Sequence, residues 1–124
     1  MLELATDWRI EVDRGPEWLF FRVVSAGLDE PKAALSRTLW ATATESATNR
    51  IVVELADGVL LNSYLIGQLI VLHKRAHMEG GTVRLCALAD HNLETLQMMR
   101  LGERFPNYAS REAAVMGHYP NKPR

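Results

Sequence analysis

Cysteine is scarce in this chain, with Cys86 alone among 124 residues. A lone thiol excludes an internal disulfide framework and a zinc site built from several cysteines, and it fits a reducing compartment. Long apolar runs are also missing, because none approaches the ~18 residues that a membrane-spanning helix needs. Acidic residues and Trp8-Arg9 interrupt the beginning of the chain, so no secretory signal is predicted. We therefore expect a cytoplasmic protein that does not insert into a membrane.

A surplus of either charge is missing as well. Lysine and arginine total 14 against 15 acidic residues, a net charge of -1, which leaves no global attraction for nucleic acid or an anionic membrane. The hydrophobic fraction of 48% is ordinary for a globular protein and is enough to bury one core. We expect one domain over residues 1–124, with its core at about 8–116. The tail 117–124 contains two prolines and is expected to fray.

The centre of the chain has the pattern of a βαβ unit. Residues 51–55 form a short apolar run rich in β-branched residues, which predicts a buried strand. A helix is predicted from Asn62-Ser63 to the Gly80-Gly81 stop, followed by a second strand over 82–88. Short joints make these two strands parallel neighbours. The apolar face of the helix recurs at three- and four-residue spacing: Leu65, Ile66, Leu69, Ile70, Leu72 and Ala76.

The first part of the chain predicts a hairpin and a helix. Residues 8–12 alternate between apolar and polar, and 18–24 are rich in aromatic and β-branched residues, so two antiparallel strands are expected. Pro31 suits the first turn of a helix over about 31–45, with Asp29 as its cap. Its predicted packing face consists of Ala34, Leu35, Leu39, Trp40 and Ala43.

Three further elements are predicted after the βαβ unit. A capped helix should start in 89–92 and close at Gly102, and 105–108 should be a short strand or an extended segment. A last helix should begin at 110–112, with 113–115 facing inward. The complete order predicts an α/β fold with a mixed, largely parallel sheet of four to five strands and about four helices.

Together these segments resemble the sulphate transporter and anti-sigma factor antagonist (STAS) domain family, over roughly residues 8–116. No single motif is decisive, but the spacing from strand through helix to Gly-Gly is fairly specific. The matching features are the Gly27-Leu28-Asp29 corner, the strand 51–55, the helix start near Ser63, the Gly80-Gly81 turn before the strand 82–86, and the helix end at 98–101 before Phe105.

The resemblance implies a non-enzymatic switch protein of bacterial transcription control. In regulatory members of the family, a helix N-terminus carries an aspartate, a serine or threonine phosphorylated by a partner kinase, and a glycine. The unphosphorylated form binds that kinase, an anti-sigma factor, and a sigma factor goes free. Counting back from the double glycine, the aspartate position falls on Asn62 and the serine before the phosphoacceptor falls on Ser63. The phosphoacceptor position falls on Tyr64 and the glycine position on Leu65, and Gly67 matches a second small position.

Two of these positions depart from the family pattern. Tyr64 carries its hydroxyl several ångströms further from the backbone than a serine would, and phosphoryl transfer depends mainly on positioning. Asn62 replaces an acidic side chain with a neutral amide. The sequence therefore predicts an atypical or absent serine/threonine phosphoswitch.

The nearest surviving hydroxyl has two interpretations. Phosphate on Ser63 would be stabilised by the free N–H groups and dipole of a helix N-terminus. Alternatively, Asn62 or Ser63 is simply the N-cap, worth about 1 kcal/mol, and this interpretation is favoured. Tyr64 is either an exposed interface anchor or a ring packed over the first helical turn with its hydroxyl in water.

Other candidate residues point to structure rather than chemistry. His73 and His77 have the i, i+4 spacing of a zinc site, but Lys74 and Arg75 lie between them and would repel a cation, so no metal site is predicted. A basic cluster near the end of a helix explains them better. Cys86 is interpreted as a small hydrophobe in a strand.

Apolar and turn residues leave some alternatives open. Asp57-Gly58 is predicted to be a turn, because the pattern of a phosphate-binding glycine loop is not present. No cofactor is expected. Met98 and Met99 are expected in the core or beside the binding surface. Aromatic residues near the hairpin either fill the core or form a dimer patch: Trp8, Trp18 and Phe20.

The favoured hypothesis is a non-enzymatic domain that binds an anti-sigma factor or related kinase. Its binding surface is predicted at 62–65, with Asp57 and the rest of the 57–61 loop, and with Asp29 and His91 beside it. One alternative is a STAS-like accessory subunit of a transport or signalling assembly. A small enzyme or nucleotide-binding protein is the least favoured, because neither a glycine fingerprint nor an acid–base pair is present.

Overall fold

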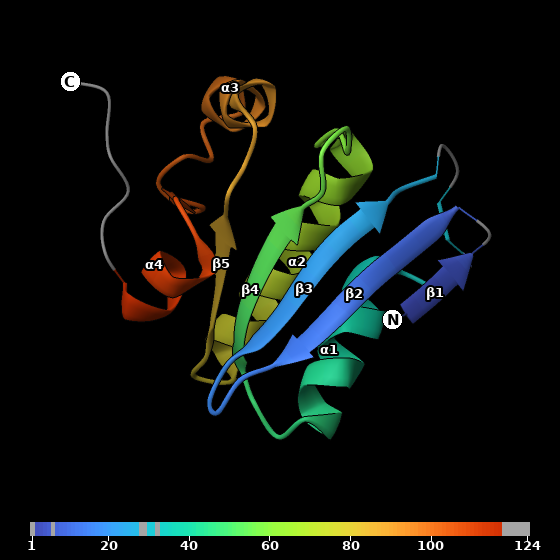
Figure 1. Ribbon diagram of the computed structural model, residues 1–124, viewed down its shortest axis with the longest axis vertical. Coiled ribbons are helices and arrows are strands. Elements are labelled where there is room, and N and C mark those ends of the chain that lie inside the picture. Colours follow the sequence, from blue (N-terminus) through green and yellow to red (C-terminus); the bar gives the residue numbers. More distant parts are fainter. Residues whose placement is uncertain (1, 6, 28–29, 32, 118–124) are drawn as a thin grey trace.

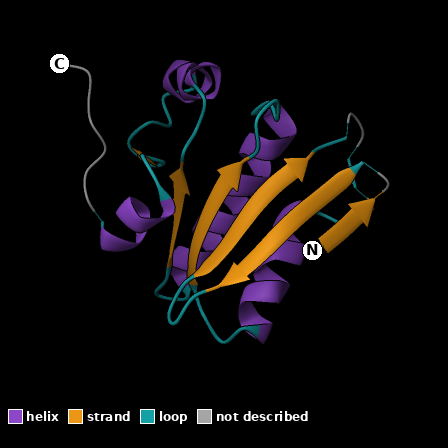
Figure 2. Cartoon of the chain, viewed as in Figure 1, coloured by secondary structure: helices purple, strands orange, loops and turns teal. Residues whose placement is uncertain are grey.

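The computed structural model describes residues 2–5, 7–27, 30–31 and 33–117, and of 2–5 the backbone only. In this part of the chain, one mixed sheet carries helices on both faces (Figures 1 and 2). The strands are β1 (Leu2–Ala5), β2 (Trp8–Arg14), β3 (Leu19–Ser25), β4 (Arg50–Leu55), β5 (Thr82–Cys86) and β6 (Asn107–Tyr108). The helices are α1 (Leu35–Glu45), α2 (Ser63–Met78), α3 (Asp90–Met98) and α4 (Arg111–Met116).

The strands of the sheet lie side by side in sequence order, from β1 to β6. The first three pair antiparallel, and β3, β4, β5 and β6 pair parallel. The predicted α/β class with a mixed, largely parallel sheet is therefore confirmed, as are the hairpin and the parallel pair around α2. Strand β1 was not predicted from the sequence. With it, the sheet has one strand more than the four to five expected. No helix of the described residues is long and apolar enough to cross a membrane.

The main core lies between the sheet and helices α1 and α2, which lie side by side behind it in Figure 1. Alternate residues of the strands point into this core, as the period of two requires. In β4 these are Ile51, Val53 and Leu55, while Val52 and Glu54 point to the opposite face. The helices contribute their apolar stripes, buried at Leu35, Leu39, Ala43, Leu65, Leu69, Leu72 and Ala76.

The start of α1 was predicted wrongly, because the helix begins at Leu35 rather than near Pro31. Its N-cap is Ala34, which has no side chain to accept a hydrogen bond, and the predicted cap Asp29 lies outside the described residues, as does Leu28 of the predicted corner. The N–H groups of Leu35 and Ser36 donate instead to side chains of α2. Since tertiary contacts satisfy these groups, no local capping signal is needed.

Three later boundaries also differ from the prediction. The strand after α2 ends at Cys86, because Ala87 turns the chain with a φ of 54°. Helix α3 ends at Met98 instead of running to Gly102, since Arg100 adopts a φ of 57°, outside the helical region. Of the strand or extended segment predicted over 105–108, only Asn107–Tyr108 form a strand, β6, and Phe105 before it is buried in the main core.

The double glycine after α2 is required by its surroundings. Gly80 has a φ of +75°, which a side chain rarely allows, and any Cβ on Gly81 would collide with the backbone oxygen of Asn49. That oxygen accepts the N–H of Thr82 at 3.0 Å, which starts β5. The turn therefore aligns the N-terminal ends of β4 and β5.

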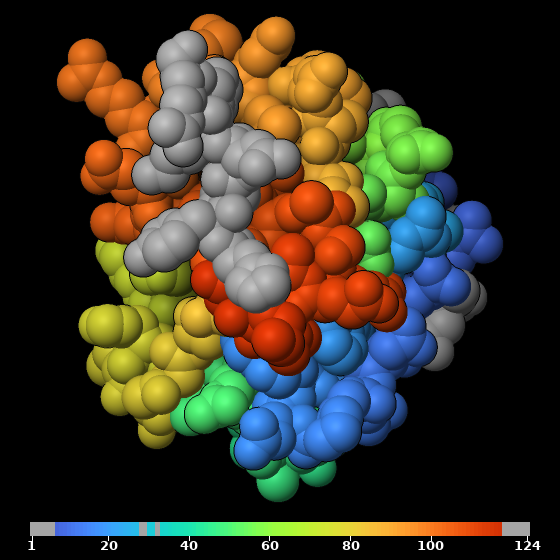
Figure 3. All heavy atoms as spheres, turned by 60° about the vertical axis from the view of Figure 1, so that its left-hand side comes forward, coloured from blue at the N-terminus to red at the C-terminus, as the bar shows by residue number. Residues whose placement is uncertain are grey.

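Helix α4 covers part of the other face of the sheet, over a smaller core. Figure 3 shows this helix, in red, between the orange segment above it and the blue hairpin strands. Ser110 caps it by accepting the N–H of Ala113, as its predicted start requires. The smaller core consists of Trp18, Val52, Cys86, Tyr108 and Ala114, with Phe20, Ala113 and Val115 packed against it.

The aromatic residues of the hairpin fill these cores. Trp8 is 1% exposed in the main core, and Trp18 is 9% exposed in the smaller one. Phe20 is half-buried beneath the guanidinium of Arg111, whose carbon lies 5.3 Å from the ring centroid. Of the two interpretations of this group, core filling is confirmed for both tryptophans.

Cys86 provides a direct test of the smaller core. Its side chain is fully buried, and burial, followed by the negative charge of Glu54, raises the pKa of the thiol to about 12. Because the thiolate is the reactive form, we expect native protein at pH 8 to resist a thiol reagent such as iodoacetamide. Intact mass spectrometry should show modification only after unfolding in denaturant. Rapid stoichiometric labelling of the folded protein would contradict this placement.

Candidate functional site

The joint between β4 and α2 begins with a tight turn. The N–H of Val59 donates to the carbonyl of Ala56 at 3.1 Å, and Gly58 between them has a φ of +84°. A positive φ at the third position is the mark of a type II turn and favours glycine there. Asp57 and Gly58 are both exposed at its tip. The predicted Asp57-Gly58 turn is thus confirmed.

A buried asparagine from α3 holds the rest of this joint. The side-chain nitrogen of Asn92 donates to the Val59 carbonyl at 3.0 Å, and its oxygen accepts the Leu61 N–H at 2.9 Å. Asn92 is only 3% exposed, so water competes little for these bonds. Leu60, between the two anchored residues, is therefore held outward with 62% of its surface exposed. Asn92 was predicted only as part of the start of a capped helix, and its contacts with the loop were not predicted.

The first turn of α2 is capped by Asn62. Its side-chain oxygen accepts the N–H of Leu65 at 2.9 Å, with the extended backbone typical of an N-cap. Of the two predicted capping residues, Asn62 is the N-cap. Ser63 is therefore the first helical residue, and its side chain is exposed.

The end of α2 near Ser63 is electropositive. Among the described residues, no acceptor lies in hydrogen-bond geometry to the N–H of Ser63 or of Tyr64. The first turn contains no acidic side chain to offset the helix dipole. An anionic group attached to Ser63 would meet these free donors, so the site can stabilise a phosphate or a partner's carboxylate.

Tyr64 points away from this exposed end, toward the neighbouring helix. Its hydroxyl oxygen accepts the N–H of Leu35 at 3.1 Å, and so caps α1. Its ring packs edge-on against Trp8, with centroids 5.6 Å apart and planes at 69°. Both predicted alternatives were wrong in part, because the half-buried ring is no free anchor and the hydroxyl does not simply face water.

Two other predicted site residues, Leu65 and Gly67, are buried or half-buried in α2. Leu65 is 1% exposed in the main core, so the prediction that its side chain is part of a binding surface is wrong. The physical reason is the helix period, which places Leu65 on the same stripe as Leu69 and Leu72. Gly67 is half-buried, and a Cβ there would meet nothing within 4 Å, so packing does not require a small residue.

Further exposed apolar side chains lie at the end of α3. Met98 is 84% exposed and Met99 54%, so they do not belong to the core. Both lie at the end of α3, the helix that carries Asn92. His91, predicted beside the site, is exposed on α3 as well. Leu60 was not singled out by the sequence, because exposure of a leucine cannot be deduced from periodicity within a loop.

The histidine pair on α2 lies well along the helix from this site. The rings of His73 and His77 are parallel at 6.4 Å, and His73 packs edge-on against Phe105. Burial, followed by the charges of Arg104 and His77, lowers the pKa of His73. No group of three or more potential metal-ligating side chains occurs within the described part of the chain.

Comparison with solved structures identifies the architecture as that of the STAS domain. The crystal structure of an anti-sigma factor antagonist from Mycobacterium paratuberculosis matches with a TM-score of 0.71 and 19% identity, over 89% of this chain and 92% of that one. A STAS domain protein from Planctomyces limnophilus matches with a TM-score of 0.64 and 19% identity, over 87% and 96% of the two chains. No protein-family model and no curated protein matches the sequence. The predicted STAS-like fold is confirmed.

Replacing Asn92 should loosen the loop that presents Leu60. Asn92→Ala leaves a buried carbonyl and a buried N–H unpaired, which should cost about 1–3 kcal/mol of stability. Gln97→Ala, an exposed amide on the same helix, is the matched control and should be nearly neutral. Denaturant unfolding measures both, and amide exchange at Leu61 should rise in the first variant. Equal stability of the two variants would contradict the anchoring role.

Removing the Tyr64 hydroxyl should weaken the start of α1. Tyr64→Phe keeps the ring against Trp8 but removes the acceptor of the Leu35 N–H, and should cost about 0.5–1.5 kcal/mol. Hydrogen exchange followed by NMR should show faster exchange at Leu35. The Leu65 amide, capped by Asn62, is the internal reference and should be unchanged. Unchanged exchange at Leu35 would show that the bond does not form.

Proposed function

We propose that the chain is a regulatory domain that binds a protein partner, an anti-sigma factor or a related kinase, through the start of α2. The binding surface comprises Ser63, the exposed Leu60 and the Asp57-Gly58 turn. The observation that supports this most is the Asn92 clamp, which holds an exposed leucine beside a helix end with free N–H groups. Rigid apolar anchors ringed by polar groups are typical of protein interfaces.

The same geometry favours Ser63 over Tyr64 as the residue of any phosphoswitch. A phosphate on Tyr64 would have to displace the hydrogen bond from Leu35, whereas the Ser63 side chain is exposed. Phosphorylation adds about -1.5 to -2 charges and three acceptor oxygens, which the free N–H groups of α2 would attract. Such a phosphate would alter the charge of the binding surface and release the partner.

A non-enzymatic role is part of this proposal. Two solved structures with this fold are named as anti-sigma factor antagonist proteins, and a bacterial cytoplasm is where such a partner would act. The departures at Asn62 and Tyr64 mean that the recognised partner differs from a kinase shaped for the usual aspartate and serine.

Binding to purified kinase-type anti-sigma factors from the source genome tests the surface. Leu60→Ala should weaken the complex roughly tenfold if Leu60 is an interface anchor. Met78→Ala, which changes a more exposed apolar residue at the far end of α2, is the control and should bind normally. Titration calorimetry gives both affinities. Binding by no candidate, or equal loss in both variants, would overturn the proposal.

Phosphorylation is tested with the same partners and ATP. Intact mass and peptide mapping should locate any phosphate on Ser63, and Ser63→Ala should abolish it while keeping the binding. Phosphate on Tyr64 in place of Ser63 would contradict the geometric argument. Binding without phosphate would leave a one-state antagonist and remove the switch from the proposal.

A further inference from the structure

A cavity of about 300 Å³ lies in the groove between α1 and α2, on the side of these helices away from the sheet. Its apolar lining comes from both helices. Trp40 of α1 is half-buried, Leu72 of α2 is buried, and Val71 remains 49% exposed. A half-exposed valine beside an indole leaves apolar surface in contact with water, which a ligand with an apolar body would cover.

The polar groups that line the cavity are mainly donors. Arg37 and Arg75 both line it, and neither forms an ion pair or hydrogen bond with a side chain among the described residues. The guanidinium carbon of Arg75 lies 5.6 Å from the centroid of the Trp40 ring. The side-chain oxygen of Gln68 already accepts the Ser36 N–H at 2.8 Å, so its NH₂ group remains as a donor.

The charge of this surface differs from that of the whole chain. Helix α1 has 11 residues and α2 has 16, and their single acidic residue is Glu45 at the far end of α1. Arg37, Lys74 and Arg75 are therefore without a carboxylate on either helix near the groove. Elsewhere Arg22, Arg50 and Arg111 form ion pairs with carboxylates. A net charge of -1 thus conceals a locally cationic groove.

We propose that this groove binds a small amphiphilic carboxylate, with its apolar body against Trp40 and Val71 and its carboxylate on Arg37 and Arg75. Two guanidinium groups and an amide NH₂ match the acceptors of a carboxylate, and charged hydrogen bonds of this type are the strong ones. The volume is at the lower end of the range for small-molecule pockets, which fits a short chain better than a peptide helix. This site is separate from the partner surface at Ser63 and does not depend on it.

Octanoate is the probe, titrated into the full chain and followed by heteronuclear NMR at the indole N–H of Trp40, assigned with Trp40→Phe. Saturable shifts at Trp40 and at the Gln68 side chain are expected. Acetate has the charge without the apolar body, and octylammonium has the body with the opposite charge, so neither should bind measurably. Equal binding of octylammonium, or shifts confined to other regions, would overturn the proposal.

Charge-matched variants locate the carboxylate. Arg75→Gln should weaken octanoate binding roughly tenfold, because it removes a charged hydrogen-bond donor. Lys74→Gln removes the same charge from the adjacent position, which does not line the cavity, and should change the affinity less than about twofold. Val71→Glu, at a half-exposed position, should abolish binding by supplying a carboxylate to the groove. Equal weakening by Arg75→Gln and Lys74→Gln would mean that octanoate is attracted only by the general positive charge, and it would overturn the proposal.

Discussion

Helix α1 cannot cap itself, and the arrangement of the helical layer follows from that constraint. Ala34 offers no acceptor, so the first two N–H groups of the helix depend on Tyr64 and Gln68 of α2. These two residues are one helical turn apart and therefore share a face of α2. A serine in place of Tyr64 would be too short to reach across. Tyr64 therefore has a structural role, since it joins the two helices through its hydroxyl.

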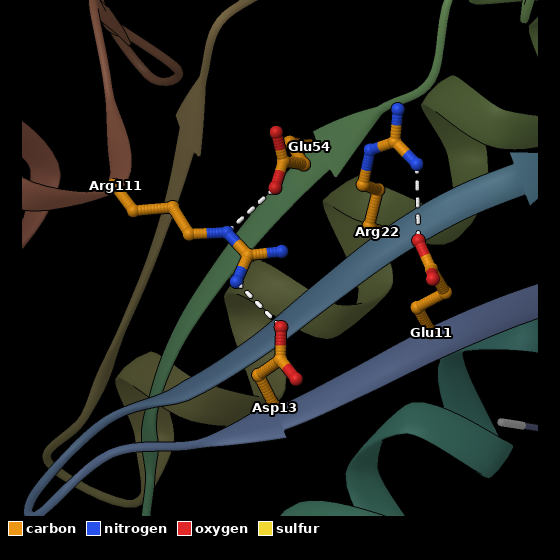
Figure 4. A network of polar contacts seen from close by, with 5 residues as sticks. All are labelled: Glu11, Asp13, Arg22, Glu54 and Arg111. Atoms are coloured by element: carbon orange, nitrogen blue, oxygen red, sulfur yellow. Dashed lines mark hydrogen bonds and ion pairs between the residues drawn. The ribbon is translucent and has the colours of Figure 1, made fainter.

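The two faces of the sheet are stabilised by different physics. Both faces have an apolar core, but on the second face Arg111 also reaches back from α4 to join Glu54 of β4 and Asp13 of β2 (Figure 4). Burial lowers the pKa of Arg111, but hydrogen bonds to Asp13 and Glu54 outweigh it and raise that pKa above its ordinary value. The Glu54 pair matters more, since Glu54 is 17% exposed and Asp13 63%, where water screens the attraction. Phe20 beneath the guanidinium adds a cation–π contact.

The sequence predicted the features that local rules govern. The strand–helix–strand unit, the Gly80-Gly81 turn and the caps at Asn62 and Ser110 all follow from periodicity or from residues a few positions apart. It did not predict the Asn92 clamp, because that residue acts on a loop 31 positions away. The start of α1 was predicted wrongly for the same reason. The side chains that cap it, Tyr64 and Gln68, are 29 and 32 positions further along the chain than the N–H groups they accept.

The placement of charges in the fold likewise does not follow from composition. Nearly balanced totals of charge exclude a global attraction for polyanions, but they carry no information about where the charges lie. Folding collects Glu11, Asp13 and Glu54 on the strands of the second face, where arginines neutralise them. Helices α1 and α2 retain their basic residues without such partners among the described residues. A protein that is nearly neutral as a whole can therefore pair its acidic side chains with arginines on one face of the sheet and leave basic side chains unpaired on the helices of the other.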